Sequence, residues 1–402
     1  MRAARICGAA PWCQGEWRPP ANPESPRRRV DARRIRVSLP AMTIELERLV
    51  VTGSPRSMGQ QQGETWRERV RAFVEMRFEA VQGYMADRGH ADWKQIFAVG
   101  ERSFGLYESW DPAGHAEQVG IAEGAGVDPL RLFTAANMTD MRDAVLLAAE
   151  RGAPLTRMVD EGCSSLLVPA GRTEAGQPLA GQTWDLNPPD VDYVVAVHRK
   201  PDEGLESWAV TCTGCLSLMG INAAGLAVGT TNIKTYGSKP GVGYLSILHR
   251  ALRAADVAEA KEVVRSAPHA GAHTYWLADA EQQLEWEASP GAQVLRTTEG
   301  GPVWRTNHCL AEVHRDNEGE VVSASTQARF ARLGTLLEVP QTPQGLRQLF
   351  ANREDGVDSI NRYAEDDQGT ATNAVFIASP AERKAWACRG PADRGTWVEL
   401  TF

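Results

Sequence analysis

The chain has 402 residues, of which 43% are hydrophobic and 23% charged, and its formal net charge at pH 7 is −8. This composition is ordinary for a folded globular protein, and the length allows one large domain or two smaller ones. The acidic balance, without a basic stripe in the body of the chain, argues against a nucleic-acid partner. No run approaches the roughly 18 uninterrupted apolar residues of a membrane-spanning helix, so no membrane partner is expected.

Residues 1–41 differ from the rest of the chain, with nine Arg, six Pro and only three acidic residues. They lack the continuous apolar stretch of a signal peptide, although an Arg-rich leader could also be an organellar transit peptide. We interpret them as a disordered extension or as translated sequence upstream of a true start at Met42. Neither a repeat nor a low-complexity linker follows, so residues 42–402 are predicted to form a single domain.

The first third of that domain is predicted to be mainly helical. A short strand at 44–51 precedes a helix that contains Gly59 and Gly63 and continues to about residue 84. A glycine pair four residues apart lies on one helical face and predicts close packing of another element there. Helical periodicity returns at about 92–107 and at 129–150.

The junction of Gly162 and Cys163, followed directly by an apolar run, is the most informative feature of the sequence. A free thiol has a pKa of about 8.5, whereas an α-amine has a pKa of about 7.7–8.0 and can take the thiol proton. A peptide nitrogen cannot do this, so cleavage before Cys163 would give one residue with both a nucleophile and a base. Gly162 suits such a cleavage site because it has no Cβ to block the thiol. The alternative is a buried cysteine at the head of a core strand.

After Gly162 the pattern changes to short apolar segments punctuated by Gly, Pro or Asn, which is typical of strands. Strands are expected at 166–168, 179–184, 193–198, 208–212, 216–221, 226–231, 274–278, 284–287, 294–296, 303–305, 373–378, 385–388 and 397–400. Helices are expected at about 242–254, 256–266, 326–338 and 343–352. This order predicts an α+β fold in which helices cover sheets.

The seven cysteines are odd in number and irregularly spaced, which favours a reducing compartment and a cytoplasmic location over a disulfide scaffold. Cys212 and Cys215 have the CxxC spacing of metal or redox sites, but no second CxxC follows. Strand alternation around them predicts thiols on opposite faces of a sheet. Packing is therefore the preferred interpretation, and neither a metal nor another cofactor is expected.

Five segments in order carry a resemblance to a known family: 161–165, Gly181-Gln182-Thr183-Trp184-Asp185, 220–226, Arg305-Thr306-Asn307-His308 and 359–362. Together they resemble the acyl-coenzyme A:isopenicillin N acyltransferase family of autoproteolytic N-terminal-nucleophile (Ntn) hydrolases. The penicillin V acylases and bile salt hydrolases are similar more distantly. The resemblance runs from about Thr43 to Val398.

This resemblance implies a four-layer αββα sandwich of the Ntn-hydrolase type with largely antiparallel sheets. It also implies self-cleavage between Gly162 and Cys163 into a mainly helical α-chain, 42–162, and a catalytic β-chain, 163–402, which stay associated. The implied chemistry is hydrolysis or acyl transfer at an amide bond of a small N-acyl substrate, and acyl-coenzyme A is one candidate partner.

The same resemblance implies roles for four further residues. Asp185 resembles the carboxylate that orients the new α-amine, and Arg362 resembles an arginine that holds a carboxylate or orients Asp185. Asn307 resembles a substrate-positioning or catalytic asparagine, and Asn232 stands where related enzymes place an oxyanion donor. The alternatives are a turn aspartate, a surface arginine and turn asparagines.

Two positions depart from the family pattern, since Asn361 stands where the family commonly has Cys and Thr183 where it usually has Asn. If that Asn contacts substrate, specificity differs here. Four tryptophans could line an acyl pocket, but core packing is the preferred interpretation for most of them: Trp184, Trp276, Trp286 and Trp304.

Two other functions remain open from the sequence. An unprocessed hydrolase would pair Cys163 with His308 or His198, although an Ntn enzyme needs neither histidine. A protein that binds a metal or another ligand would use Cys212 and Cys215.

Overall fold

The computed structural model describes residues 44–90, 92–155 and 162–402, and the predicted extension at 1–41 lies outside them. Contacts join residues 42–402 into one unit. None of the described helices is long and apolar enough to cross a membrane.

The described residues before the Gly162–Cys163 junction are mainly helical, as the sequence predicts, but the helix expected to continue to about residue 84 is broken at Trp66 and the helix at Pro112–Ala125 was not predicted. The six described helices are α1 (Pro55–Thr65), α2 (Arg67–Ala86), α3 (Gln95–Trp110), α4 (Pro112–Ala125), α5 (Pro129–Ala136) and α6 (Met138–Leu146). Three of them begin at a Ser or Asp whose side chain accepts a backbone N–H, with Pro in the first turn. The single helix expected at 129–150 is wrong. It breaks at Asn137, whose backbone leaves helical geometry, and ends at Leu146.

The glycine pair of α1 packs closely against α4, which confirms the predicted close approach. A Cβ at Gly59 would lie 2.1 Å from the Glu117 carbonyl oxygen, and one at Gly63 would lie 2.1 Å from the Ile121 carbonyl oxygen. Because the obstacles are backbone atoms, only glycine fits at these two positions.

One sheet has eight strands in the order β1-β4-β5-β6-β7-β8-β9-β10. Only the β1–β4 pair is parallel among its described strands. The strands are β1 (Arg48–Gly53), β4 (Val194–Pro201), β5 (Ser207–Cys212), β6 (Met219–Asn222), β7 (Ala227–Asn232), β8 (His273–Ala278), β9 (Gln283–Ala288) and β10 (Gln293–Thr297).

The second sheet has six strands in the order β11-β2-β3-β12-β13-β14, and its described pairs are all antiparallel. Its strands are β2 (Gly162–Val168), β3 (Leu179–Leu186), β11 (Val303–Arg305), β12 (Ala371–Ser379), β13 (Lys384–Arg389) and β14 (Val398–Leu400). β2 and β3 are buried along their whole length, polar residues such as Ser164 and Gln182 included.

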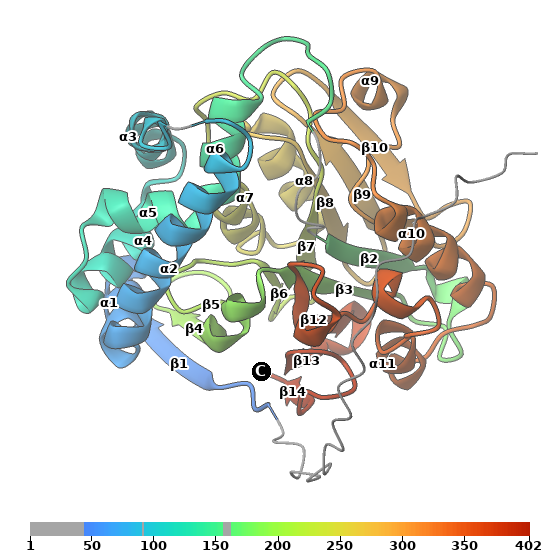
Figure 1. Cartoon of the computed structure of the whole chain (residues 1–402). Coiled ribbons are helices and arrows are strands. Elements are labelled where there is room, and N and C mark those ends of the chain that lie inside the picture. The colour runs from blue at the N-terminus through green and yellow to red at the C-terminus, as the bar shows by residue number, and fades with distance from the viewer. Residues whose placement is uncertain (1–43, 91, 156–161) are drawn as a thin grey trace, which may run out of the picture. The chain divides into compact units, whose positions relative to one another are not determined.

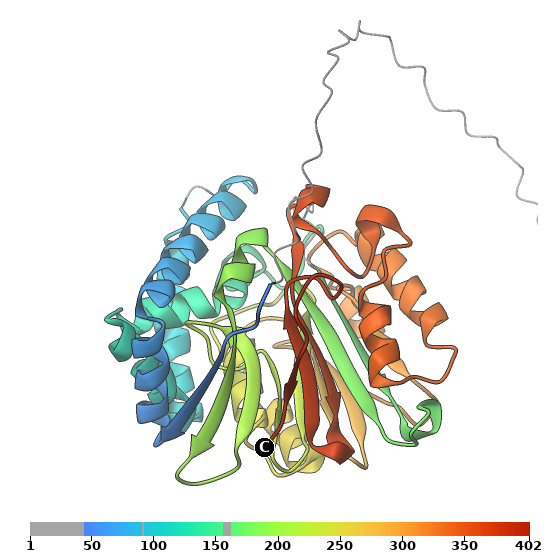
Figure 2. The ribbon, with the colours of Figure 1, turned by 90° about the horizontal axis from the view of Figure 1, so that it is seen from below.

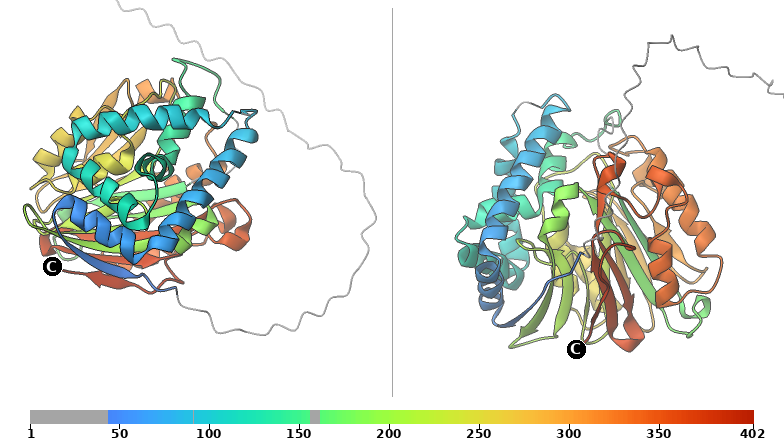
Figure 3. Two further views of the ribbon diagram at one scale, coloured as in Figure 1. Left: turned by 90° about the vertical axis from the view of Figure 1, so that its left-hand side faces the viewer. Right: turned by 60° about the horizontal axis from the view of Figure 1, so that its bottom comes forward.

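The two sheets pack face to face between two helical layers (Figures 1 and 2). β2 and β3 contact β7, and β12 contacts β6. The N-terminal helices cover the larger sheet together with α7 (Tyr244–Ala251) and α8 (Val257–Ser266), whereas α10 (Ala324–Leu336) and α11 (Pro343–Phe350) cover the smaller one (Figure 3). Short helices complete the structure: α9 (Glu312–Arg315) and the 3₁₀ turns Ala170–Arg172, Pro188–Tyr193, Gly356–Asp358, Ala364–Asp366 and Pro380–Glu382. This arrangement confirms the α+β, four-layer αββα prediction.

We predict that Gly63→Val lowers the thermal unfolding midpoint, because its side chain must push α4 away from α1; overpacking of this kind costs about 1–3 kcal/mol. Gly83→Ala in α2 is the matched control, since a Cβ there meets no atom within 4 Å. It should raise stability by about 0.5–1 kcal/mol. Thermal unfolding of both variants compares them, and equal stability for Gly63→Val and the parent chain would contradict the packing argument.

Candidate active site

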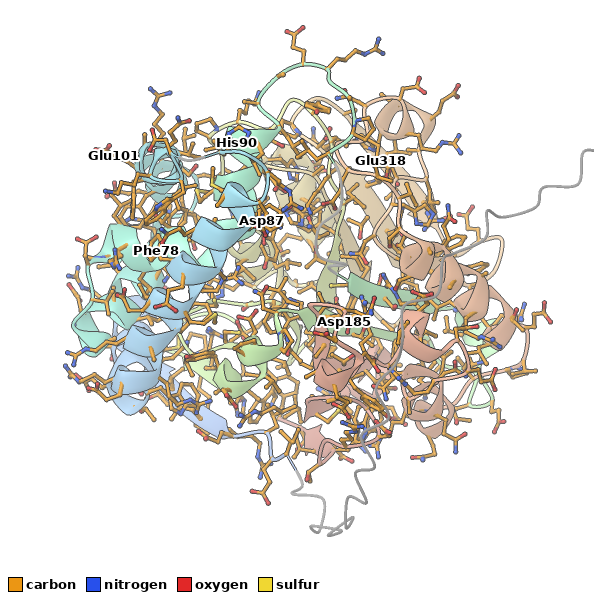
Figure 4. The ribbon with its side chains drawn as sticks, viewed as in Figure 1. Phe78, Asp87, His90, Glu101, Asp185 and Glu318 are labelled. Carbon is orange, nitrogen blue, oxygen red and sulfur yellow. The ribbon has the colours of Figure 1, made fainter. Side chains whose placement is uncertain are left out.

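The hairpin of β2 and β3 brings the proposed cleavage site opposite the predicted carboxylate. In the antiparallel register, Gly162 pairs with Asp185 and Cys163 pairs with Trp184. β3 lies between β2 and β12, so Asp185 sits in the middle of the smaller sheet and of the molecule (Figure 4). The Gly162–Cys163 junction and the motif that ends at Asp185 are thus adjacent in space.

A small cavity of about 30 Å³ lies at this end of the hairpin. Both sheets and two helices contribute to its lining: Thr139, Gly162, Cys163, Trp184, Asp185, Leu186, Leu218, Thr230, Asn232, Tyr244, His273 and Asn307. Four predicted site residues therefore share one cavity, since Cys163, Asp185, Asn232 and Asn307 all line it.

The amide of Asn307 connects Cys163 to the opposite sheet. The Cys163 backbone nitrogen donates to Asn307 Oδ1 at 2.7 Å, and Asn307 Nδ2 donates to the Asn232 carbonyl oxygen at 2.9 Å. Because its Nδ2 faces a carbonyl, Asn307 must present its oxygen to Cys163. A side-chain acceptor thus holds the nitrogen that would become an α-amine after cleavage.

The Cys163 thiol is buried and poorly ionised in the intact chain. Burial, and then the nearby charge of Asp185, raise the pKa of this thiol to about 12. Backbone hydrogen bonds from Asp185 and Asn232 and the charge of Arg329 act in the opposite direction. A backbone group that favours the thiolate is an N–H donor, so two N–H groups point toward the sulfur.

Asp185 is also fully buried, and its charge is held by two arginines. Burial raises the pKa of Asp185 to about 6, although the charges of Arg329 and Arg362 and hydrogen bonds from Thr372 and Thr183 lower it. Thr183 is therefore a support for Asp185 and does not line the cavity. Asp185 Oδ1 has no hydrogen-bond partner among the described residues.

Gly162 lies against both arginines and the carboxylate. A Cβ at this position would lie 2.9 Å from Arg362 Nη1, 3.2 Å from Asp185 Oδ2 and 3.3 Å from Arg329 Nη2. Arg362 therefore lies beside the junction and is 1% exposed, which excludes the surface-arginine alternative.

Arg329 is a central site residue that the sequence analysis missed. From α10, its Nη1 donates to the Cys163 carbonyl oxygen at 2.6 Å and to Ser164 Oγ at 3.1 Å. Its Nη2 donates to Asn307 Oδ1 at 3.1 Å. The sequence gives no signal for this role, because one arginine in an amphipathic helix resembles a solvated one. Tyr244 and His273 also line the cavity. The sequence does not indicate them either, because a tyrosine at the start of a helix and a histidine at the start of a strand have no distinctive pattern.

The two histidines considered for a Cys/His pair lie elsewhere. Neither His308 nor His198 is among the cavity-lining residues. His308 contacts Thr306 and packs edge-on against Phe330, whereas His198 Nε2 forms a hydrogen bond with Glu206 at 3.1 Å. This placement does not support an unprocessed Cys/His enzyme.

The predicted separation of Cys212 and Cys215 is wrong. β5 ends at Cys212, and the Cys215 N–H bonds back to the Cys212 carbonyl oxygen at 2.9 Å, so the turn returns the second thiol to the first. Burial, and then the neighbouring Cys215 thiol, raise the pKa of the Cys212 thiol well above its usual value. No group of three or more possible metal ligands occurs in the described ranges, so the pair has no metal cluster around it there.

Among the four tryptophans, Trp184 lines the cavity, and the others do not. Trp276 is fully buried and donates from Nε1 to Gln182 Oε1 at 2.7 Å, which fits the core role expected for most of them.

The family described as acyl-coenzyme A:6-aminopenicillanic acid acyl-transferase matches residues 172–394, a range that contains Asp185, Asn232, Asn307 and Arg362. Similar solved structures include a mutant conjugated bile acid hydrolase from Clostridium perfringens, with 11% identity, a TM-score of 0.37 and coverage of 60% of this chain and 92% of that one. Penicillin V acylase from Agrobacterium tumefaciens has 13% identity, a TM-score of 0.34 and coverage of 59% and 86%.

If the chain cleaves itself before Cys163, we predict that this cleavage accelerates as the pH rises from 5 to 7. The pKa of Asp185 is about 6 in the intact chain, so the carboxylate that can accept the thiol proton forms over this interval. Gel analysis of freshly purified chain after transfer to each pH would give the rates. Asp185→Asn should not show this increase of the cleavage rate with pH. An increase that persists in the variant would show that another group causes it.

Arg329→Lys should slow self-cleavage by about tenfold or more, because a single ammonium group cannot reproduce the forked contacts of the guanidinium. Arg332→Lys provides a control one turn along the same helix, where the side chain pairs with Glu354 and Asp355 instead. Time courses of cleavage distinguish the two variants. Equal cleavage rates in both would show that Arg329 does not contribute to cleavage.

Proposed function

The chain belongs to the acyl-coenzyme A:6-aminopenicillanic acid acyl-transferase family, and we propose that it is an autoproteolytic N-terminal-cysteine enzyme that acts on the amide bond of a small N-acyl compound. The observation that carries this proposal is the hydrogen bond from the Cys163 backbone nitrogen to Asn307 Oδ1. A buried cysteine with only a packing role does not need a side chain that binds its backbone nitrogen. Here a side chain also holds the nitrogen, beside a buried carboxylate.

The first stage of the proposal is self-cleavage. The Cys163 thiol attacks the Gly162 carbonyl carbon, and Asp185 takes the thiol proton. The C–N bond breaks as its nitrogen takes a proton, which leaves a thioester between Gly162 and Cys163. Water hydrolyses this thioester to a Gly162 carboxylate and a free Cys163 with an α-amine. Arg362 and Arg329, within reach of Gly162, would stabilise the negative charge that develops at its carbonyl.

The second stage is catalysis by the processed chain. With a pKa of about 12, the thiol of the intact chain is almost wholly protonated at neutral pH. The new α-amine, with an ordinary pKa of about 7.7–8.0, can take this proton and return it to the leaving amine. The thiolate attacks the acyl carbon, and Asn232 with a backbone N–H near the sulfur would hold the oxyanion.

Water or an amine then releases the acyl group, and this acceptor decides between hydrolysis and acyl transfer. Acyl-coenzyme A is a candidate acyl donor on the basis of the family description. Formation of free acid or of a new amide from an added amine distinguishes the two reactions. The proposed location is the cytoplasm, in keeping with the five described cysteines, which are all free thiols.

We predict that the purified chain separates under denaturing conditions into two pieces, the second of which begins at Cys163. This piece comprises residues 163–402 and accounts for about 26 kDa of the 43.8 kDa chain. Cys163→Ala should remain uncut and inactive, because it lacks the nucleophile of both stages. Intact-mass spectrometry provides the measurement.

Cys388→Ala is the matched control, since Cys388 is another fully buried thiol in the smaller sheet. It should be cut like the parent chain. An uncut parent chain, or a cut and active Cys163→Ala, would refute the proposal.

A further inference from the structure

Three large side chains form an apolar part of the wall of the catalytic cavity: Trp184, Leu218 and Tyr244. All three residues are buried. Trp184 pairs directly with Cys163 across β2 and β3, and the side chains of directly paired residues project from the same face of a sheet. An acyl group attached to the Cys163 sulfur therefore lies next to Trp184, on the apolar side of the cavity.

A second, smaller cavity lies directly behind these three side chains. Its volume is about 10 Å³, and Trp184, Leu218 and Tyr244 line it as well as the catalytic cavity. Its other lining residues include Phe73 of α2 and Leu245 of α7. The three shared side chains thus form a partition between the two spaces.

The tyrosine of this partition is held in place by a buried aspartate and a histidine. Asp140 Oδ2 accepts the Tyr244 N–H at 2.8 Å, and Asp140 Oδ1 lies 2.8 Å from His273 Nε2. The Tyr244 ring stacks on the His273 ring, with the ring centroids 4.5 Å apart. Asp140 therefore fixes both the backbone of Tyr244 and the ring that supports its side chain. Because of these contacts, the partition cannot open for a larger acyl group without losing buried interactions.

The space behind the partition is partly charged. Arg77 Nη1 and Asp190 Oδ2 form an ion pair at 3.4 Å, and both residues are buried and line the second cavity. A buried charge keeps its stability only while it is paired and hydrogen-bonded. An aliphatic chain that passed the partition would lie beside this pair and offer it no polar contact. The second cavity is thus neither large enough nor apolar enough to receive the tail of a long acyl group.

The catalytic cavity itself is small. Its volume of about 30 Å³ is far below the roughly 300–1,000 Å³ of pockets that enclose drug-sized ligands. A cavity of about 400 Å³ does occur in the described structure, at the starts of α1 and α4, so tight packing is a property of this site. One methylene group too many for an apolar pocket typically lowers kcat/KM by about 10–200-fold. Acyl length is therefore the property that this site can discriminate.

We propose that the partition of Trp184, Leu218 and Tyr244 restricts the substrate to N-acyl compounds with short acyl groups, such as acetyl and propionyl. This inference rests on the function proposed above, since it places the acyl group on the Cys163 sulfur. The carbon chain of a short acyl group ends at the partition, whereas a longer chain meets it. Tyr244 is the specificity-determining residue of the three, because its ring is fixed from behind by Asp140 and His273.

The test compares 4-nitrophenyl acetate with 4-nitrophenyl hexanoate on the processed enzyme, since the two esters differ only in acyl length. Release of 4-nitrophenol gives kcat/KM for each ester, and peptide masses show whether the acyl group is on Cys163. The kcat/KM for hexanoate should be lower than that for acetate by a factor of about ten or more. A smaller difference, or a preference for hexanoate, overturns the inference.

Tyr244→Ala removes the ring from the partition and joins the two cavities, so the ratio of the hexanoate to the acetate kcat/KM should rise about tenfold. Leu245→Ala is the matched control, because this next residue of α7 lines the second cavity and not the catalytic one. It enlarges the space behind the partition and leaves the partition intact, so the ratio should stay at the parent value. An unchanged ratio in Tyr244→Ala, or an equal rise in Leu245→Ala, overturns the inference.

Two further outcomes are separated by the same measurements. If Tyr244→Ala is not processed, Leu218→Ala takes its place with the same expected rise, because Leu218 also stands between the two cavities. A parent enzyme that forms no acyl adduct on Cys163 with either ester refutes the proposed function itself. Acetyl and hexanoyl adducts that form on Cys163 at equal rates support the proposed function and refute the role of the partition.

Discussion

The hydrogen bond between the Cys163 nitrogen and Asn307 is the contact on which the rest of the site depends. Asn307 follows β11 of the smaller sheet, and its amide also binds the Asn232 carbonyl at the end of β7 in the larger sheet. One side chain therefore fixes the nucleophile's nitrogen and the distance between the two sheets at the cavity. Residues of both sheets, Cys163 and Asp185 among them, line the small cavity beside this contact.

The segment that carries Asn307 is itself held by buried charges. Arg305 in β11 is fully buried and binds Glu285 at 2.5 Å and Glu287 at 2.6 Å, both on β9 of the other sheet. Burial would raise the pKa of Glu287, but the hydrogen bond from His314 and the charge of Arg305 hold it down to about 2. Glu287 thus stays ionised at working pH and also accepts the Leu310 N–H. An ionic link between the sheets is expected to be rigid, because separating the partners would leave unpaired buried charges.

The sequence points to Cys163 and Asp185 by local patterns and to Asn232, Asn307 and Arg362 by the family resemblance, but it gives no indication of Arg329 and His273. Cys163 and Asp185 stand in short strands whose apolar runs and glycines are visible in the chain, and they meet as paired strands do. Arg329 and His273 give no such signal, because an arginine in an amphipathic helix and a histidine in a buried strand look ordinary until the partner sheet is present. The sequence wrongly predicts the Cys212 and Cys215 thiols on opposite faces of a sheet, because strand alternation ends with β5 at Cys212, where a turn reverses the chain.

Reactivity of the Cys163 thiol before and after cleavage tests the central claim, that a freed amine activates a buried thiol. Iodoacetamide would label the processed enzyme and an uncut Gly162→Val chain between pH 6 and 9, and peptide masses would locate the label. We predict rapid alkylation of Cys163 in the processed enzyme, with an inflection at about the pKa of 7.7–8.0 of an α-amine. The uncut chain should react only slowly. Equal rates in the two chains would show that cleavage does not create the base, and the account would be wrong.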